Sequence, residues 1–169
     1  MQSYRFTPKI KGVVQELIED LLEKGFVTPS RAPCRSPIVL VKMKDDTYRM
    51  CVDYRRLNEV TVKDPFLLPH IETLLTKIDD AQISSMLDLH RAHHQIPMRK
   101  EDQQKTAFVT PTGKKEYTVM PFGLVNAPST FARYMADLFR DLKFVCVYLE
   151  DILIVSRSRQ EHWKHLDEV

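Results

Sequence analysis

Cysteine is scarce in this sequence, and its placement excludes two kinds of fold. The three cysteines, Cys34, Cys51 and Cys146, are odd in number and widely separated along 169 residues. This spacing fits neither a disulfide framework nor a paired zinc motif. We therefore expect a reducing, intracellular setting for the chain.

Long hydrophobic runs and a strong net charge are also absent. The longest uninterrupted apolar run is the six residues 144–149, whereas a membrane span needs ~18, and the first residues show no signal-peptide pattern. We therefore expect no membrane partner. The net charge of +2 predicts no strong sequence-independent binding of nucleic acid, so any basic surface must be local. A chain of 169 residues with 43% hydrophobic residues suits one domain that can have two lobes.

A pair of acids inside an apolar segment is the strongest local signal. Between residues 144 and 156 the only charges are Glu150 and Asp151, which separate two short apolar runs that predict a hairpin. Unpaired carboxylates are costly to bury and adjacent ones repel each other, so they need water, a cation or a metal as partner. The pattern predicts either a metal or catalytic site at this turn or a solvated turn at the rim of a sheet.

The remaining pattern predicts an α/β fold with an antiparallel-rich sheet. Apolar spacing predicts a helix from Thr7-Pro8 to Gly25, a helix over 71–78, a helix that starts at Asn126 and buries Phe131, Tyr134, Met135, Leu138 and Phe139, and the start of another in 156–169. Short apolar runs predict strands over 38–41, 47–53, 83–89, 106–109, 117–120, 144–149 and 152–155.

Asp88 is a third acid in apolar surroundings, inside the predicted strand 83–89. It is distant from Glu150 in sequence, yet both should lie at the ends of central strands, where one sheet edge could gather all three acids. Three carboxylates around two Mg²⁺ ions suit a two-metal nucleotidyl transfer. The three histidines of residues 90–94 also suggest zinc, but no cysteine or acid lies at a matching spacing, so a solvated polar cluster is the alternative.

Several motifs together resemble one family, in order along nearly the whole chain. They are Ser36-Pro37-Ile38-Val39-Leu40-Val41, Arg49-Met50-Cys51-Val52-Asp53-Tyr54-Arg55-Arg56-Leu57-Asn58, Leu87-Asp88-Leu89, His94-Gln95-Ile96-Pro97-Met98, Lys105-Thr106-Ala107-Phe108, Val119-Met120-Pro121-Phe122-Gly123-Leu124-Val125-Asn126-Ala127-Pro128-Ser129-Thr130-Phe131 and Tyr148-Leu149-Glu150-Asp151-Ile152-Leu153-Ile154. With these motifs the chain resembles the fingers and palm of the reverse transcriptase of gypsy-class long-terminal-repeat retrotransposons.

The resemblance implies a right-handed polymerase fold and a catalytic triad of acids. Residues up to about 60 and part of 90–120 would form the fingers, and the remainder the palm, in a truncated domain that lacks the thumb, connection and RNase H segments. Asp88 matches the first catalytic aspartate, while Glu150 and Asp151 fill the positions of the adjacent aspartate pair. These acids would hold two Mg²⁺ ions, or Mn²⁺ in their place.

The resemblance also implies a nucleotide pocket. Arg49 and Lys44 match the fingers residues that grip the incoming triphosphate, one as a planar fork and the other as a point charge. His93 occupies the position where the family usually has a tyrosine beneath the nucleotide sugar. Phe122 and Gly123 match the turn that lines the pocket.

The template side and the partners follow from the same resemblance. Asp53, Tyr54 and Arg55 match a template-side segment. The expected partners are an RNA or DNA template with its primer, a dNTP, and the thumb and RNase H segments of a polyprotein. By family the chain would act in a cytoplasmic particle or in the nucleus, and an organelle stays open.

Four departures from the family pattern predict weak or absent activity. The first acid of the pair is Glu150, whose extra methylene moves the carboxylate by about 1 Å, a displacement that can cost ~10²-fold in rate. His93 replaces the usual tyrosine, Met43 a usual lysine, and Asp46 a usual turn glycine. Three hypotheses follow: an RNA-directed DNA polymerase domain that performs two-metal nucleotidyl transfer from a dNTP to a primer 3′-hydroxyl, a non-catalytic nucleic-acid binder, and an inactive retroelement remnant.

Overall fold

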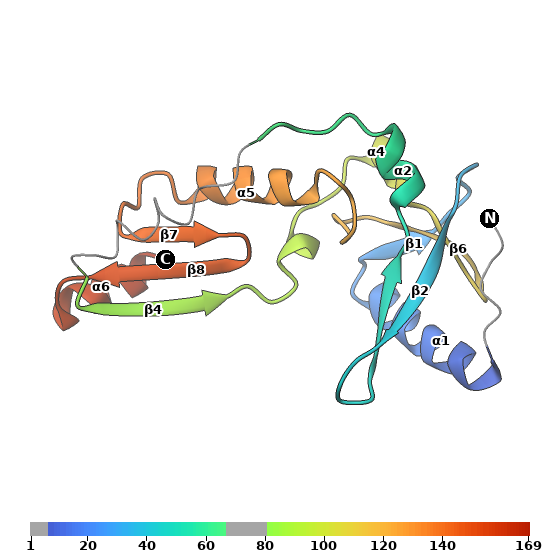
Figure 1. Cartoon of the computed structure of the whole chain (residues 1–169), viewed down its shortest axis with the longest axis horizontal. Coiled ribbons are helices and arrows are strands. Elements are labelled where there is room, and N and C mark those ends of the chain that lie inside the picture. The colour runs from blue at the N-terminus through green and yellow to red at the C-terminus, as the bar shows by residue number, and fades with distance from the viewer. Residues whose placement is uncertain (1–6, 67–80) are drawn as a thin grey trace. The chain divides into compact units, whose positions relative to one another are not determined.

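The chain forms two compact units in the computed structural model, which describes residues 7–66 and 81–169 (Figure 1). Unit 1 comprises Met1–Val62 and His93–Ala127, and unit 2 comprises Lys63–Ala92 and Pro128–Val169. The helix predicted over 71–78 lies outside the described residues. Within the described parts of the chain, none of the helices has both the length and the apolar character that crossing a membrane requires.

Unit 1 is built around a five-stranded sheet. Its elements are α1 (Pro8–Glu23), β1 (Val27–Pro29), β2 (Ser36–Lys42), β3 (Tyr48–Val52), α2 (Arg55–Val60), α4 (Lys100–Gln103), η2 (Gln104–Thr106), β5 (Phe108–Thr110) and β6 (Gly113–Tyr117), with η1 (Ala92–Gln95) at the unit boundary. The strand order is β1-β6-β5-β2-β3, and β2–β5 is the parallel pair among antiparallel ones. The predicted α/β fold with antiparallel-rich sheets is therefore confirmed.

Helix α1 begins and ends where the sequence predicts. Pro8 occupies the first turn, where its missing N–H costs nothing, and Thr7 is the N-cap residue, although its side chain forms no capping hydrogen bond. Gly25 has φ +69°, the left-handed conformation that ends many helices, and Phe26 N–H donates to Leu21 O at 2.9 Å. The apolar face of the helix packs into the core of unit 1.

That core draws on every large element of unit 1. Its buried members are Val14, Ile18, Val27, Ile38, Val52, Tyr54, Phe108 and Tyr117. The Tyr54 hydroxyl donates to Thr106 O at 2.8 Å, and the Tyr117 N–H donates to Thr106 Oγ1 at 2.9 Å, so the buried polar atoms are paired. Burial raises the pKa of Tyr117 to about 12, and it also raises the pKa of Tyr54 well above its usual value.

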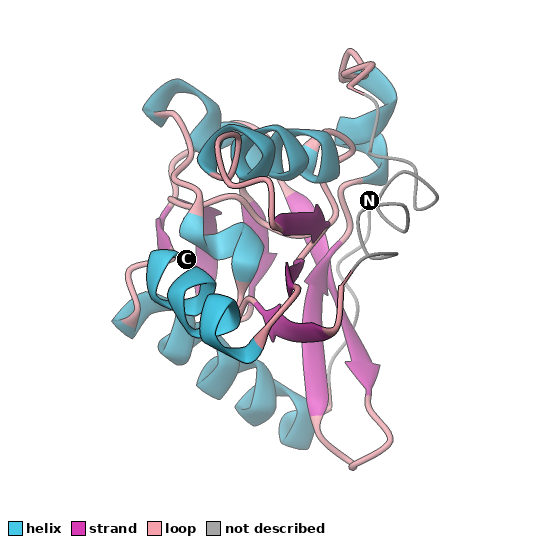
Figure 2. Ribbon diagram, turned by 90° about the vertical axis from the view of Figure 1, so that its left-hand side faces the viewer, coloured by secondary structure: helices cyan, strands magenta, loops and turns pink. Residues whose placement is uncertain are grey.

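Strands β2 and β3 form a hairpin that ends in an exposed loop (Figure 2). The predicted pair over 38–41 and 47–53 is confirmed, with β2 longer at both ends. In the loop Asp46 has φ +63°, a left-handed conformation that glycine adopts at less cost than a residue with a side chain. Asp45 accepts hydrogen bonds from the N–H and hydroxyl of Thr47 at 3.1 and 2.6 Å, and these bonds lower the pKa of its carboxyl.

Two other strand predictions are wrong in their bounds, and several short elements were not predicted. The predicted hairpin over 106–109 and 117–120 is instead β5–β6, whose second strand starts at Gly113; beyond it, Val119 forms only an isolated bridge with Pro97. The sequence of β6 contains Lys-Lys-Glu and so lacks the apolar pattern that predicts a strand. These polar residues are tolerated because the side chains of β6 are mostly half-buried. The short elements β1 and α2 present too few residues to show a period.

Unit 2 is built around an antiparallel three-stranded sheet, in the order β4-β8-β7. Its elements are β4 (Ile83–Asp88), α5 (Ala127–Leu138), β7 (Val145–Tyr148), β8 (Asp151–Ser156) and α6 (Arg159–Glu168). Helix α5 buries Phe131 and Met135, each 2% exposed. Tyr134 and Leu138, predicted on the same face, are 54% and 58% exposed, so that part of the prediction is wrong.

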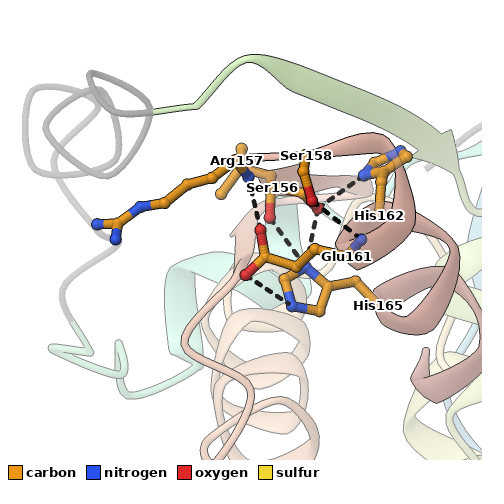
Figure 3. Close-up of polar contacts among 7 residues, drawn as sticks. Ser156, Arg157, Ser158, Glu161, His162 and His165 are labelled. Carbon is orange, nitrogen blue, oxygen red and sulfur yellow. Dashed lines mark hydrogen bonds and ion pairs between the residues drawn. The ribbon is translucent and has the colours of Figure 1, made fainter.

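Helix α6 is fastened to the sheet by a serine-histidine network (Figure 3). Ser156 Oγ, at the end of β8, lies 2.8 Å from Nδ1 of both His162 and His165, and His162 Nε2 lies 2.8 Å from Ser85 Oγ on β4. At the start of the helix, Ser158 Oγ accepts the Glu161 N–H at 3.3 Å, while the Glu161 carboxylate accepts the Arg157 N–H at 2.7 Å. The two bonds cap α6 in a variant of the capping box, because Glu161 accepts from the residue before the N-cap and not from the N-cap Ser158 itself.

Candidate active site

The three acids expected to hold metal lie in unit 2, where β4 ends and β8 begins. Asp88 is the last residue of β4 and Asp151 the first of β8, and the antiparallel register pairs them directly. Directly opposed residues in such a ladder have Cα atoms about 4.5–5.5 Å apart. The Leu89 N–H donates to Glu150 O at 3.2 Å. The backbone thus brings the distant aspartate beside the acidic pair.

The turn between β7 and β8 holds only one of the two adjacent acids. Because Tyr148 pairs with Asp151, the loop consists of Leu149 and Glu150, and the prediction that Asp151 also lies in the turn is wrong. Leu149 has φ +53°, a left-handed conformation that two-residue hairpins require and that costs a leucine roughly 1–2 kcal/mol. Such strain clusters at functional sites, which makes this tip a candidate independently of its charges.

The donor chemistry of this tip suits Mg²⁺. Asp88 and Asp151 are exposed and directly opposed, and Glu150 is half-buried next to them. Across the described residues no three His, Cys, Asp or Glu side chains are arranged as a ready-made metal cluster. Mg²⁺ is usually held by one or two carboxylates together with substrate phosphates, and the opposed pair Asp88 and Asp151 matches that number of carboxylates.

Three of the residues expected at the nucleotide pocket are stacked together in unit 1. The ring centroids of His93 and Phe122 lie 4.6 Å apart, and the Arg49 guanidinium lies 5.3 Å from the Phe122 centroid. Gly123 follows Phe122 with φ +92°, a conformation that favours glycine. Lys44 lies apart from this stack, exposed in the loop between β2 and β3.

The residues expected on the template side divide into one core residue and one ion pair. Tyr54 is 2% exposed and belongs to the core of unit 1. Arg55 donates to both carboxylate oxygens of Asp53, at 2.9 and 2.7 Å, and these bonds lower the pKa of Asp53 to about 2. The Asp53 side chain is 7% exposed whereas that of Arg55 is 79% exposed, so Arg55 is the residue that can meet a partner.

The histidines considered for zinc have aromatic neighbours instead. The His94 ring lies 5.0 Å from that of Phe26 and 5.6 Å from that of Phe122, between centroids. Together with the His93 contact to Phe122, these distances give both rings a role in packing.

Asn58 is a residue of this region that the sequence prediction overlooked. Its side-chain amide on α2 donates to Gly123 O at 2.8 Å and accepts the Val125 N–H at 2.9 Å. Asn126 donates in turn to Val62 O at 2.8 Å. Asparagine in a short helix normally indicates a surface position. Only the hydrogen-bond partners of Asn58, 65 and 67 residues away in sequence, show that it holds the loop after Phe122.

Residues 41–169 match the family described as reverse transcriptase (RNA-dependent DNA polymerase). The chain therefore belongs to the reverse transcriptase family, as its motifs predict.

Its relatives are polyproteins of retrotransposons. The chain is 40% identical over 172 residues to the retrovirus-related Pol polyprotein from transposon opus of Drosophila melanogaster, covering 98% of this chain and 17% of the relative. It is 37% identical over 171 residues to the transposon Tf2-3 polyprotein of Schizosaccharomyces pombe, covering 100% and 13%. The chain thus spans less than a fifth of the length of these curated relatives.

Solved structures share the fold. The foamy viral protease-reverse transcriptase in complex with an RNA/DNA hybrid superposes with a TM-score of 0.90 and 28% identity, over 99% of this chain and 23% of that one. The same enzyme in complex with double-stranded DNA gives a TM-score of 0.89 at 28% identity, over 99% and 35%.

Proposed function

We propose that the chain is the fingers and palm of an RNA-directed DNA polymerase that transfers a nucleotide from a dNTP to a primer 3′-hydroxyl. The observation that carries the proposal is the register of β4 and β8, which opposes Asp88 to Asp151 at a strained hairpin tip. Membership in the reverse transcriptase family supports it.

The acids and the stacked residues take separate roles in this reaction. Asp88 and Asp151, with Glu150, would hold two Mg²⁺ ions, for which Mn²⁺ can substitute. When bound, these ions lower the pKa of the attacking hydroxyl and neutralise charge on the phosphates. The primer 3′-oxygen bonds to the α-phosphorus of the dNTP, its proton is released, and the bond to the departing pyrophosphate breaks.

In unit 1, Arg49 and Lys44 would bind the triphosphate, and His93 would lie against the sugar. Because the Arg49 guanidinium lies over the Phe122 ring, it is held at the ring while its polar edge can donate to phosphate oxygens. His93 is 8% exposed and packed on the same ring, so it has little freedom to yield to a 2′-hydroxyl. In this proposal, the residue that would exclude a 2′-hydroxyl from the sugar position is therefore a histidine.

The template and primer are the proposed macromolecular partners. The foamy viral enzyme is described in complex with an RNA/DNA hybrid and with double-stranded DNA, which supports the same class of partner here. The net charge of +2 leaves binding to local contacts, for which the exposed Arg55 is the best-placed candidate on the template side.

Primer extension on an RNA template with Mg²⁺ or Mn²⁺ tests the proposal. We expect weak extension by the chain as it stands and an increase of about 10²-fold with Glu150→Asp, because a shortened side chain restores the carboxylate position. Glu101→Asp, the same change at an exposed helical site, should leave the rate unchanged. Asp88→Asn should abolish extension. Extension that is absent even with Glu150→Asp, or that persists with Asp88→Asn, would contradict the proposal.

A further inference from the structure

The loop that carries Phe122 is held by one side chain that is not expected to touch substrate. Asn58, on α2, reaches Gly123 O at 2.8 Å and the Val125 N–H at 2.9 Å. Its amide nitrogen donates to a carbonyl while its amide oxygen accepts from an N–H. These partners fix the orientation of the amide, because the reversed amide would place like groups against each other.

The other side of the loop rests on the end of β3 and on the core. A Cβ atom added to Gly123 would lie 3.5 Å from Val52 O and 3.6 Å from the Tyr54 ring, which is ordinary van der Waals contact, so the loop backbone faces both groups. Tyr54 is itself fixed by its hydrogen bond to Thr106. The loop is therefore positioned by packing on one side and by the Asn58 amide on the other.

Phe122 directly precedes Gly123, the residue at which the Asn58 amide and the packing contact meet the loop. Its ring contacts His93 at 4.6 Å and lies 5.3 Å from the Arg49 guanidinium. The ring is 37% exposed, so the stack alone does not enclose it. A displacement of the Gly123 carbonyl would move the surface against which Arg49 and His93 are aligned.

We infer that Asn58 is a positioning residue for nucleotide binding, acting through the backbone of Gly123 and Val125 on the Phe122 stack. The inference rests on the proposed function, since it gives Arg49 and His93 their nucleotide roles. It predicts that loss of the Asn58 hydrogen bonds to Gly123 and Val125 affects the affinity for the dNTP more than the rate of the chemical step. The reason is that the acids proposed to bind metal belong to the other unit.

The test compares Asn58→Asp with Thr118→Val in the 169-residue chain. Asn58→Asp keeps the shape and the acceptor for Val125 but places an oxygen against Gly123 O. Thr118→Val also removes a side-chain donor to a backbone carbonyl, that of Gly25 at 2.6 Å, and so controls for a general loss of stability. Asn58→Gln keeps the amide but lengthens the side chain by one methylene, and so tests whether the distance between α2 and the loop is critical.

Two readouts separate this inference from the proposed function. Amide hydrogen exchange reports the Val125 N–H, and titration with Mg·dATP followed by NMR reports nucleotide affinity without any turnover. We expect Asn58→Asp to speed exchange at Val125, because repulsion between the carboxylate and Gly123 O separates the side chain from the loop. We also expect it to weaken dATP binding by about tenfold, with less than a twofold change in kcat wherever extension is measurable. Thr118→Val should change neither.

Several results would overturn the inference. They are dATP binding that stays unchanged in Asn58→Asp, exchange at Val125 that stays unchanged, an equal loss of affinity in Thr118→Val, or no dATP binding by the unsubstituted chain. Binding of dATP that responds to Asn58→Asp, in a chain that extends no primer even as Glu150→Asp, would support the inference while contradicting the proposed function.

Discussion

The backbone conformation of Asp46 destabilises the fold, whereas its ion pair with Lys42 stabilises it. Its φ of +63° is costly for a residue with a side chain, by roughly 1 kcal/mol. Its ion pair with Lys42, at 2.5 Å, joins side chains that are 83% and 59% exposed and is worth little for that reason. The strain outweighs the ion pair.

We therefore expect Asp46→Gly to raise the free energy of unfolding by about 0.5 kcal/mol, measured by urea denaturation. Asp45→Gly is the matched control, because Asp45 has no positive φ and accepts two hydrogen bonds from Thr47. The control should instead lower the free energy of unfolding, because it loses both hydrogen bonds. Equal destabilisation by both changes would show that Asp46 is unstrained.

Ionisation of Asp53 makes the free energy of unfolding of unit 1 depend on pH. Its pKa in the folded chain, about 2, lies below the usual value because Arg55 donates to both of its oxygens. A lowered folded-state pKa gives stability that is complete above pH ~4 and is lost as the pH falls through 2. Exposure of Arg55 limits this contribution to on the order of 1 kcal/mol.

Asp53→Asn should accordingly lower stability at pH 5 and flatten the decline in the free energy of unfolding between pH 4 and pH 2. Denaturation curves at each pH measure both effects. A decline as steep in Asp53→Asn as in the unsubstituted chain would assign the acid sensitivity to other carboxyl groups.

At the scale of elements, α6 depends on hydrogen bonds more than on apolar packing. His162 is 7% exposed and bonds to Ser156 on β8 (Figure 3) and to Ser85 on β4. The His165 ring is stacked on that of Phe144, with the ring centroids 3.7 Å apart. Replacing His162 would leave two hydroxyls without this partner in a partly buried site.

We expect His162→Ala to lower the free energy of unfolding of unit 2 by about 2–3 kcal/mol and to speed amide exchange throughout α6. Lys164→Ala, at an exposed position of the same helix, should stay within about 0.5 kcal/mol. A similar loss from both substitutions would refute the idea that the network fastens the helix.

The elements that could be predicted from the sequence are those with a long period or a clear turn. The apolar pattern from Ile10 to Leu22 predicts α1, and the apolar runs around Glu150 predict β7 and β8. Tyr134 and Leu138 were misplaced because helical spacing marks an apolar stripe wider than the surface that α5 covers. Only tertiary contacts decide which part of the stripe is buried.

At the scale of the whole chain, the candidate site depends on pairings between distant segments. The resemblance to reverse transcriptases assigns the acids, but the opposition of Asp88 to Asp151 follows from the β4–β8 register, which no local pattern encodes. The same holds for Asn58, whose partners lie across unit 1. The identity of the candidate acids could be predicted from the sequence, whereas the hydrogen bonds of Asn58 to Gly123 and Val125 could not.

The central claim is that Asp88 and Asp151 hold metal together, and Mn²⁺ titration followed by NMR tests it most directly. Paramagnetic Mn²⁺, added in the presence of dATP, should broaden the amide signals of residues 88–89 and 150–152 first, and Asp88→Asn should remove that broadening at both strands. Broadening that first affects other exposed acids, such as Asp45 and Asp46, or that survives at 150–152 in Asp88→Asn, would contradict the claim.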